Sequence, residues 1–441
     1  MIESGHKNQS KFNLYSILIS IILVSGSLRF NGISLIDEAV FLIFLILMYN
    51  YKEKNKTFRS SSLYINYYFK KANNSFNILF IYLFFSLILG LYYDPYFGKI
   101  RWAVILVGIV LVNKLTLFYL RDKLNNYSRL ILLKKIHKYI LYFCIFYVSY
   151  ALFFKLFFGL DPAYIQSAQI EAWYAIWGTT AYTAIIFLLL VLYSKILYAN
   201  KAISLNKLIF VYLLLFFASI LFDSRVMLLI LLLYLVVDMY QSNYKFLFMS
   251  IVLAIATILT LYFSQTIFMQ DFMSSGDFLW QLLFDDQITT RRDFDRVAHY
   301  IAAFNTINNS FFEMIFGTGF LNAGKSIINE YYNVYYQYEV PVAHIASNIS
   351  GLSKGTFGLS AFIIENGWLG VLLFVMHIYN MCMIAVKTKL IVPSLYIVAT
   401  YLLLIFIMFT IYINDNMAFY LMLIPSIFIY PLISNCNPPK N

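Results

Sequence analysis

Charge is scarce in this sequence. Only 12% of its 441 residues are charged, whereas 61% are hydrophobic, and the mean hydropathy is +0.74. A soluble protein carries roughly twice that charged fraction. Apolar runs of about 20 residues recur along the whole length, which is typical of transmembrane helices. The composition therefore excludes a soluble protein and predicts an all-α polytopic membrane protein.

Cysteine is also rare, and histidine-rich tracts are missing. Cys144, Cys382 and Cys436 lie far apart without a CxxC pair, so the sequence indicates neither a disulfide framework nor a metal site. We expect no cofactor, and we interpret the cysteines in apolar runs as small apolar side chains. The first apolar run follows Lys7 and Lys11 and lacks a small-residue cleavage site, which predicts an uncleaved first helix.

Twelve apolar runs are candidate membrane spans. The shorter ones need tilt or a longer helix to cross about 30 Å of hydrocarbon. Neither an internal repeat nor a soluble domain is evident, so we expect residues 1–441 to form a single integral membrane domain. The predicted spans are residues 14–30, 34–50, 76–93, 102–120, 138–160, 180–198, 207–222, 226–240, 245–266, 365–385, 391–412 and 416–434.

Lysine and arginine collect at alternate junctions between these spans. Segments 51–75 and 121–138 each carry six of them. The remaining junctions on that side carry Lys195, Lys201, Lys207, Lys245, Lys387 and Lys389. The positive-inside rule makes this side cytoplasmic, with both termini on it, and places residues 267–364 outside, between spans 9 and 10. The net charge of +11 therefore reflects membrane orientation, and no nucleic-acid partner is expected.

A smaller set of cations falls on the outer side, where topology does not require them. They suggest an anionic ligand bound there, although snorkelling to lipid phosphate explains Arg29, Lys99 and Arg101 equally well. Lys155 and Arg225 sit where outer headgroups or a cavity must receive them. Arg225 belongs to a tight polar corner, Asp223-Ser224-Arg225, and its guanidinium could bind a phosphate through two hydrogen bonds. The alternative is an Asp223–Arg225 pair that ends two helices.

The interval 267–364 is the one long polar stretch of the chain, and we expect the chemistry there. It holds nine acidic residues, five basic residues and two of the five histidines. A helix is predicted from Thr290 onward, because Thr290 can cap it with Asp293 in the place of a capping-box acid. Helical spacing puts four residues on one face: Arg292, Arg296, His299 and Ala303.

Two interpretations of this predicted helix stay open. Its basic face, together with Arg291, could grip a phosphate, or Asp293 and Asp295 could pair with the arginines in an interfacial helix. We favour the phosphate because Arg225 independently indicates an anion. Asp295 and His299 also form an i, i+4 pair. An apolar stripe is expected to press the helix onto the bundle through Phe294, Val297, Ile301 and Phe304.

Further candidates follow along the chain. Gly317 and Gly319 form a two-glycine turn that could cradle a phosphate, and Lys354 is a secondary cation candidate. His344 could act as a general base or be a plain surface histidine. Glu365 is expected to open an apolar span, where a helix N-terminus stabilises a carboxylate, and that structural role could be its only one.

The order of these motifs resembles the bacterial O-antigen polymerase and ligase superfamily. Its members carry a Ser-Arg step before an apolar helix, matched here by Ser224-Arg225-Val226-Met227. An arginine-led helix then runs into a Gly-x-Gly turn, matched from Arg291 and Arg292 to Gly317-Thr318-Gly319. A Glu-x-Gly-x-x-Gly step opens the next span, matched by Glu365-Asn366-Gly367-Trp368-Leu369-Gly370.

The resemblance implies a GT-C-like helical fold with a large periplasmic loop, and glycosyl transfer at the periplasmic face of the bacterial inner membrane. Undecaprenyl-pyrophosphate-linked glycans would be donor and acceptor, and a chain-length regulator protein is a further partner candidate. Arg225, Arg291, Arg292 and Arg296 would hold the pyrophosphate leaving group without a metal. A base would deprotonate the acceptor hydroxyl, with inversion at the anomeric carbon.

The sequence departs from the ligase branch in one respect. Ligases place a histidine, typically followed by asparagine, shortly before the Glu-x-Gly step, whereas here the nearest histidine, His344, lies further from Glu365. The departure favours a polymerase and leaves His344, His299, Asp295 and Glu365 as candidates for the base. A flippase or transporter for a lipid-linked glycan is the alternative of another class. It should hold paired charges near the bilayer midplane, where the sequence offers only Lys114.

Overall fold

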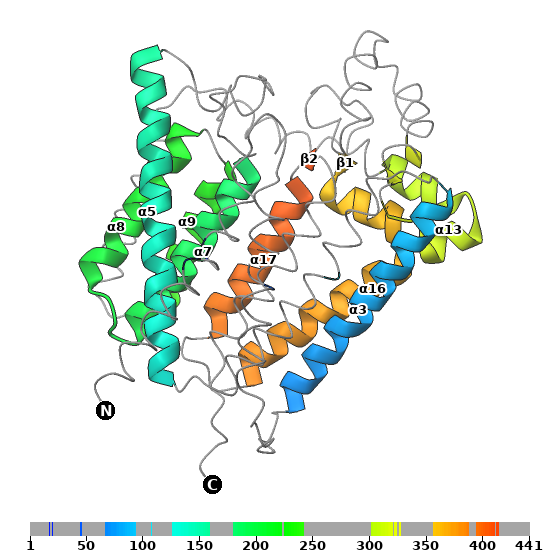
Figure 1. Cartoon of the computed structure of the whole chain (residues 1–441), viewed down its shortest axis with the longest axis horizontal. Helices are drawn as coiled ribbons and strands as arrows, with labels where there is room; N and C mark the ends of the chain where they lie inside the picture. The colour runs from blue at the N-terminus through cyan, green and yellow to red at the C-terminus, as the bar shows by residue number, and fades with distance from the viewer. Residues whose placement is uncertain are drawn as a thin grey trace.

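The computed structural model describes residues 67–93, 126–158, 180–222, 225–241, 301–320, 356–387, 394–410 and 412–413, with a few isolated positions besides. These residues are helical apart from turns and one two-residue antiparallel pair, β1 (Thr356–Phe357) with β2 (Tyr412–Ile413) (Figure 1). The helices are α3 (Tyr67–Tyr93), α5 (Asn126–Phe158), α7 (Thr180–Ala199), α8 (Leu205–Leu221), α9 (Arg225–Gln241), α13 (Phe311–Phe316), α16 (Gly358–Lys387) and α17 (Ser394–Thr410).

Three stretches of these helices are long and apolar enough to cross a membrane: Asn73–Tyr93, Leu130–Phe157 and Leu359–Met383. The remaining long helices contain shorter apolar segments: Thr183–Ala199, Leu205–Leu221, Val226–Asp238 and Leu395–Ile405. This architecture agrees with the expectation of a helical membrane protein.

Three described helices begin clearly earlier than the hydropathy pattern predicts: α3 at Tyr67 instead of residue 76, α16 at Gly358 instead of residue 365, and α5. The α5 helix starts at Asn126 instead of residue 138, because Leu132, Leu133, Ile136 and Ile140 continue a buried stripe through the lysine-rich segment. Lysine is a good helix former, and its long side chain reaches away from the apolar face. Hydropathy therefore marked only the uncharged part of this helix.

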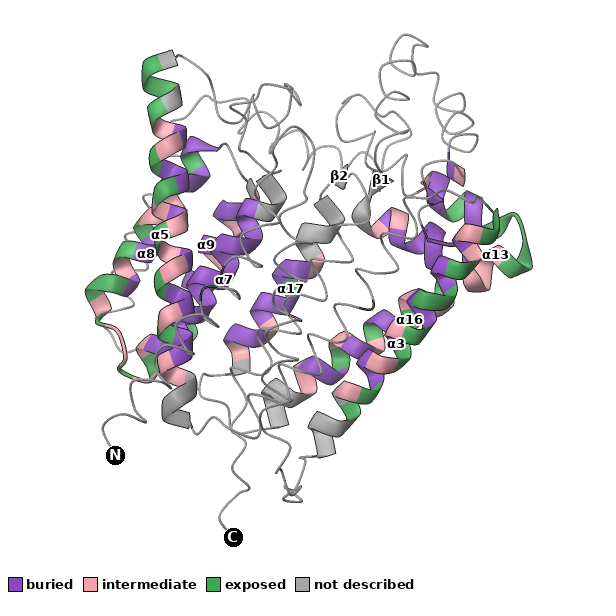
Figure 2. Ribbon diagram, viewed as in Figure 1, coloured by how far each residue is buried: buried purple, intermediate pink, exposed green. Residues whose placement is uncertain are grey.

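The helices form two groups joined by α17. On one side α5, α7, α8 and α9 pack together, and on the other side α3 packs along α16, with α13 at one end of that pair (Figure 1). The α7 helix is the core of the first group, since every residue from 183 to 197 is buried (Figure 2). Large apolar side chains are exposed on α3, α5 and α8, as expected of helices that face lipid.

Contacts between helix ends show how the helices run. The β1–β2 pair brings the start of α16 and the end of α17 together, and Ser86, near the end of α3, bonds to Glu365 in the first part of α16. At the opposite end of α17, Tyr396 contacts Asp238 at the end of α9. These directions agree with the alternation of spans that the lysine and arginine pattern predicts.

Candidate functional site

A two-glycine turn follows the short helix α13. Ser310 caps this helix, accepting a hydrogen bond of 3.0 Å from the backbone N–H of Glu313. The chain then passes through Gly317 and Gly319, whose φ angles are +77° and +86°. These left-handed conformations favour glycine. The turn leaves the N–H groups of Thr318 and Gly319 free to bond outside their own helix.

The partner of this turn is a break in α16. Gly367 has φ 57° and ψ −170°, a non-helical conformation between two helical segments. The N–H of Thr318 donates to the carbonyl oxygen of Ile364 at 2.8 Å, and the N–H of Gly319 donates to that of Glu365 at 3.1 Å. The two motifs, separated in sequence, therefore meet backbone to backbone.

The α3 helix also takes part in this contact between the Gly317–Gly319 turn and the break at Gly367, which we call the junction. The Tyr82 hydroxyl donates to the carbonyl oxygen of Asn366 at 2.5 Å, and the Ser86 hydroxyl donates to that of Glu365 at 3.1 Å. The N–H of Phe320 donates to the carbonyl oxygen of Ser86 at 2.9 Å. Carbonyl groups next to the break thus have partners, which a buried helix interruption requires.

Glu365 lies inside the junction with only 4% of its surface exposed. The expectation that it opens the span at a helix N-terminus is wrong, because α16 begins at Gly358 and Glu365 precedes the break. The intervening residues are apolar apart from Ser360, and Phe362, Ile363 and Ile364 are buried, so the helix extends back beyond the predicted start. The neighbouring Asn366 is 1% exposed, and its Oδ1 has no hydrogen-bond partner among the described residues.

The other predicted site residues divide into two groups. Arg225 is the first residue of α9, and Lys155 lies in the last turn of α5 with an exposed side chain, which fits contact with lipid headgroups. Both helix ends lie at the same end of the bundle as the junction (Figure 1). The remaining candidates lie outside the described residues: His344, His299, Asp295, Arg291, Arg292, Arg296 and Lys354.

The helix predicted from Thr290 onward is described only over residues 301–308. There Ala302, Ala303 and Ile307 are fully buried, whereas Phe304 is 38% exposed and stacks on Trp368 with ring centroids 5.7 Å apart. The buried face of this segment is therefore the face of Ala303. Phe304 of the predicted apolar stripe contacts the bundle through Trp368 of α16, as expected, although both rings stay partly exposed.

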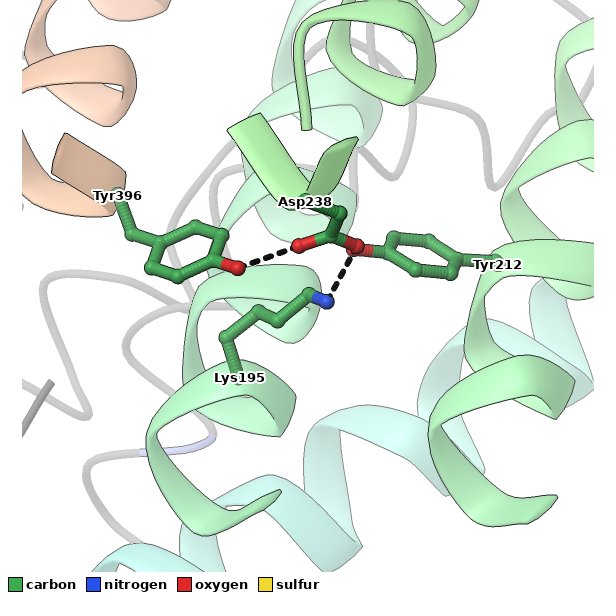
Figure 3. Close-up of polar contacts among 4 residues, drawn as sticks. All are labelled: Lys195, Tyr212, Asp238 and Tyr396. Atoms are coloured by element: carbon green, nitrogen blue, oxygen red, sulfur yellow. Dashed lines mark hydrogen bonds and ion pairs between the residues drawn. The ribbon is translucent and has the colours of Figure 1, made fainter. Parts of the chain in front are cut away.

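A second polar cluster was missed in the sequence. Lys195 of α7 forms a buried ion pair with Asp238 of α9, and Asp238 also accepts hydrogen bonds from Tyr212 of α8, at 2.7 Å, and from Tyr396 of α17 (Figure 3). The Lys195 ammonium lies 4.9 Å from the ring centroid of Tyr212 and 5.4 Å from that of Tyr396. Four helices are thus joined at one carboxylate.

Lys195, which the charge pattern counts among the cations at the junctions between spans, is buried in this cluster. It is 4% exposed and Asp238 is 1% exposed, so the pair is buried near the ends of α7 and α9. The cluster lies at the opposite end of the bundle from the glycine turn. Its sequence signal is one charged residue in each of two apolar runs, Lys195 and Asp238, which is too weak to identify the partners.

Comparisons with models of protein families, with curated proteins and with solved structures find no match to the chain. Within the described ranges, no three histidine, cysteine or acidic side chains gather in a way that could hold a metal ion.

Proposed function

We propose that the protein is a glycosyltransferase that polymerises undecaprenyl-pyrophosphate-linked repeat units into O-antigen or a similar surface polysaccharide. The supporting observation is the junction at one end of the bundle. There the Gly317–Gly319 turn meets the Glu365-Asn366-Gly367 step, and both are motifs of the resemblance. Arg225 begins α9 at the same end. The proposed fold has about twelve membrane-spanning helices in a GT-C-like arrangement. Each of these helices needs about 20 residues to cross the membrane.

In the proposed reaction the acceptor hydroxyl oxygen attacks the anomeric carbon of the donor glycan. The new glycosidic C–O bond forms as the bond from that carbon to the pyrophosphate oxygen breaks, with inversion. A base takes the hydroxyl proton, and undecaprenyl pyrophosphate leaves with the bonding electron pair. Fixed cations that meet the developing charge would lower the barrier.

The predicted cations are suited to bind the pyrophosphate leaving group. Arg225, Arg291, Arg292 and Arg296 would bind the pyrophosphate, because guanidinium groups bind phosphate oxygens through paired hydrogen bonds. The predicted helical spacing puts Arg292 and Arg296 on the face of Ala303, and Ala303 is fully buried. Such a face would direct those arginines toward the bundle.

Glu365 is our first choice for the base because it is buried at the junction. His344, His299 and Asp295 stay candidates. A carboxylate held in a buried, shaped site can take a proton from a substrate hydroxyl within hydrogen-bond reach.

One observation favours the transporter alternative. The buried Lys195–Asp238 pair is the kind of paired charge that a flippase for a lipid-linked glycan would use. The pair lies near the ends of α7 and α9, however, whereas the substrate site of such a transporter is expected near the bilayer midplane. We therefore retain the polymerase as the leading proposal, with the ligase that moves glycan to the lipid A core as the nearest alternative.

A deletion strain tests the proposal through its lipopolysaccharide pattern. A polymerase defect leaves core with one repeat unit, whereas core without any repeat indicates a ligase or a flippase. Unchanged long chains would contradict the proposal.

A further inference from the structure

The α3 helix presents a polar and small-residue stripe to the break in α16. Tyr82, Ser86 and Gly90 are spaced four residues apart, so they share one helix face. All three are buried. The two hydroxyls donate to the last carbonyl oxygens before Gly367. A Cβ on Gly90 would clash with the carbonyl group of Phe320, so the glycine lets the turn approach the helix closely.

The Tyr82 hydroxyl connects the parts of the junction. It donates to the carbonyl oxygen of Asn366 at 2.5 Å and lies 3.3 Å from that of Phe316, at the end of α13. The Tyr82 ring also packs against Gly370, beyond the break, where an added Cβ would lie 3.0 Å from the Cε1 atom of the ring. One side chain of α3 therefore contacts both segments of α16 and the start of the glycine turn.

We propose that Tyr82 is a positioning residue for Glu365, assisted by Ser86. The inference rests on the proposed function. The Glu365 backbone is fixed by two hydrogen bonds to its carbonyl oxygen, from Ser86 and from Gly319, and the break that follows is fixed by Tyr82. In the proposed transfer the Glu365 carboxylate takes the acceptor proton as the glycosidic bond forms. Small displacements of such a base reduce the rate strongly.

The test compares conservative variants of the full-length protein in membranes, with undecaprenyl-pyrophosphate-linked repeat units as substrate. Tyr82→Phe keeps the ring and removes the hydroxyl. Two matched controls lie on the same helix. Tyr92→Phe changes an exposed tyrosine, and Ser75→Ala removes a buried hydroxyl whose partner is Nδ1 of His377, at a distance of 3.3 Å.

We expect Tyr82→Phe to lower kcat about tenfold with little change in KM, as the loss of one positioning hydrogen bond would do. The acidic limb of the pH–rate profile should move in Tyr82→Phe and stay in place in both controls. In a Glu365→Gln background, Tyr82→Phe should have little further effect, because the two residues act through one group.

Three results would overturn the inference. The first is a normal kcat for Tyr82→Phe. The second is a loss of equal size in Ser75→Ala, which would indicate general α3–α16 packing. The third is an undiminished Tyr82→Phe effect in the Glu365→Gln background. A wild-type protein that does not lengthen the glycan would instead refute the proposed function, and the inference with it.

Discussion

The break in α16 depends on the conformation of Gly367. Its combination of φ 57° and ψ −170° belongs to a region that only glycine populates readily. A Cβ at this position would lie 2.6 Å from the amide nitrogen of Gly317 and equally close to the carbonyl carbon of Ile315. A methyl group would therefore strain the backbone and push the glycine turn away.

Gly367→Ala is expected to destabilise the junction by about 1–3 kcal/mol from backbone strain, with the clash added. Long-chain polysaccharide should disappear in a strain that carries the variant at the wild-type level of protein. Leu372→Ala, a change at a 63% exposed position of the same helix, is the control and should keep long chains. Normal chain length in Gly367→Ala would contradict the role of the break.

The residues of the junction differ in how far sequence could predict them. Glu365, Gly317 and Gly319 were predicted because each belongs to a short motif. Tyr82 and Ser86 were not, since their carbonyl partners are 284 and 279 residues away along the chain. Only the four-residue spacing of Tyr82, Ser86 and Gly90 marked them in the sequence, and many lipid-facing helices could carry such a pattern.

At the scale of elements, hydropathy located the end of each long described helix within two residues, whereas the starts of α3, α5 and α16 precede the predicted ones. The starts of α7, α8 and α9 match the predicted spans within a few residues. In α5 the helix continues through charged residues because a buried stripe persists there, whereas α16 begins with apolar residues, among them the buried Phe362, Ile363 and Ile364. Average hydropathy does not register a stripe, so the start of α5 could be found only from periodicity.

The Lys195–Asp238 cluster joins α7, α8, α9 and α17, and its charges stabilise the bundle only as a pair. Removing one partner leaves a buried charge uncompensated, which costs about 3–5 kcal/mol. We expect Lys195→Met and Asp238→Leu each to lower the unfolding temperature of the purified protein. The double variant should recover much of the loss because no unpaired charge remains.

Lys207→Met is the control for this prediction, since Lys207 is an exposed lysine at the same end of the bundle. It should leave the unfolding temperature unchanged. Single variants as stable as the wild type would show that the ion pair does not stabilise the bundle. A double variant less stable than either single variant would show that the polar cluster itself is required.

At the scale of the molecule, the glycine turn and the ion-pair cluster lie at opposite ends of the bundle. The predicted orientation places the turn outside and the cluster near the cytoplasm. Single cysteines in a chain whose native cysteines are replaced by serine test this. A membrane-impermeant maleimide should label Tyr92→Cys, at the exposed end of α3, in cells with an intact inner membrane.

Lys207→Cys, at the start of α8, should react only after that membrane is permeabilised. The reverse pattern would show that the protein has the opposite orientation in the membrane, with the glycine turn on the cytoplasmic face. Labelling of both positions in intact cells would contradict the predicted alternation of spans between α3 and α8.

The most direct test of the polymerase uses purified full-length protein in vesicles supplied with undecaprenyl-pyrophosphate-linked repeat units. We expect glycans of two or more repeats, with one undecaprenyl pyrophosphate released for each bond formed. Arg225→Ala and Glu365→Gln should reduce both products together. Repeat units that cross the vesicle membrane without lengthening would contradict the polymerase and support a transporter.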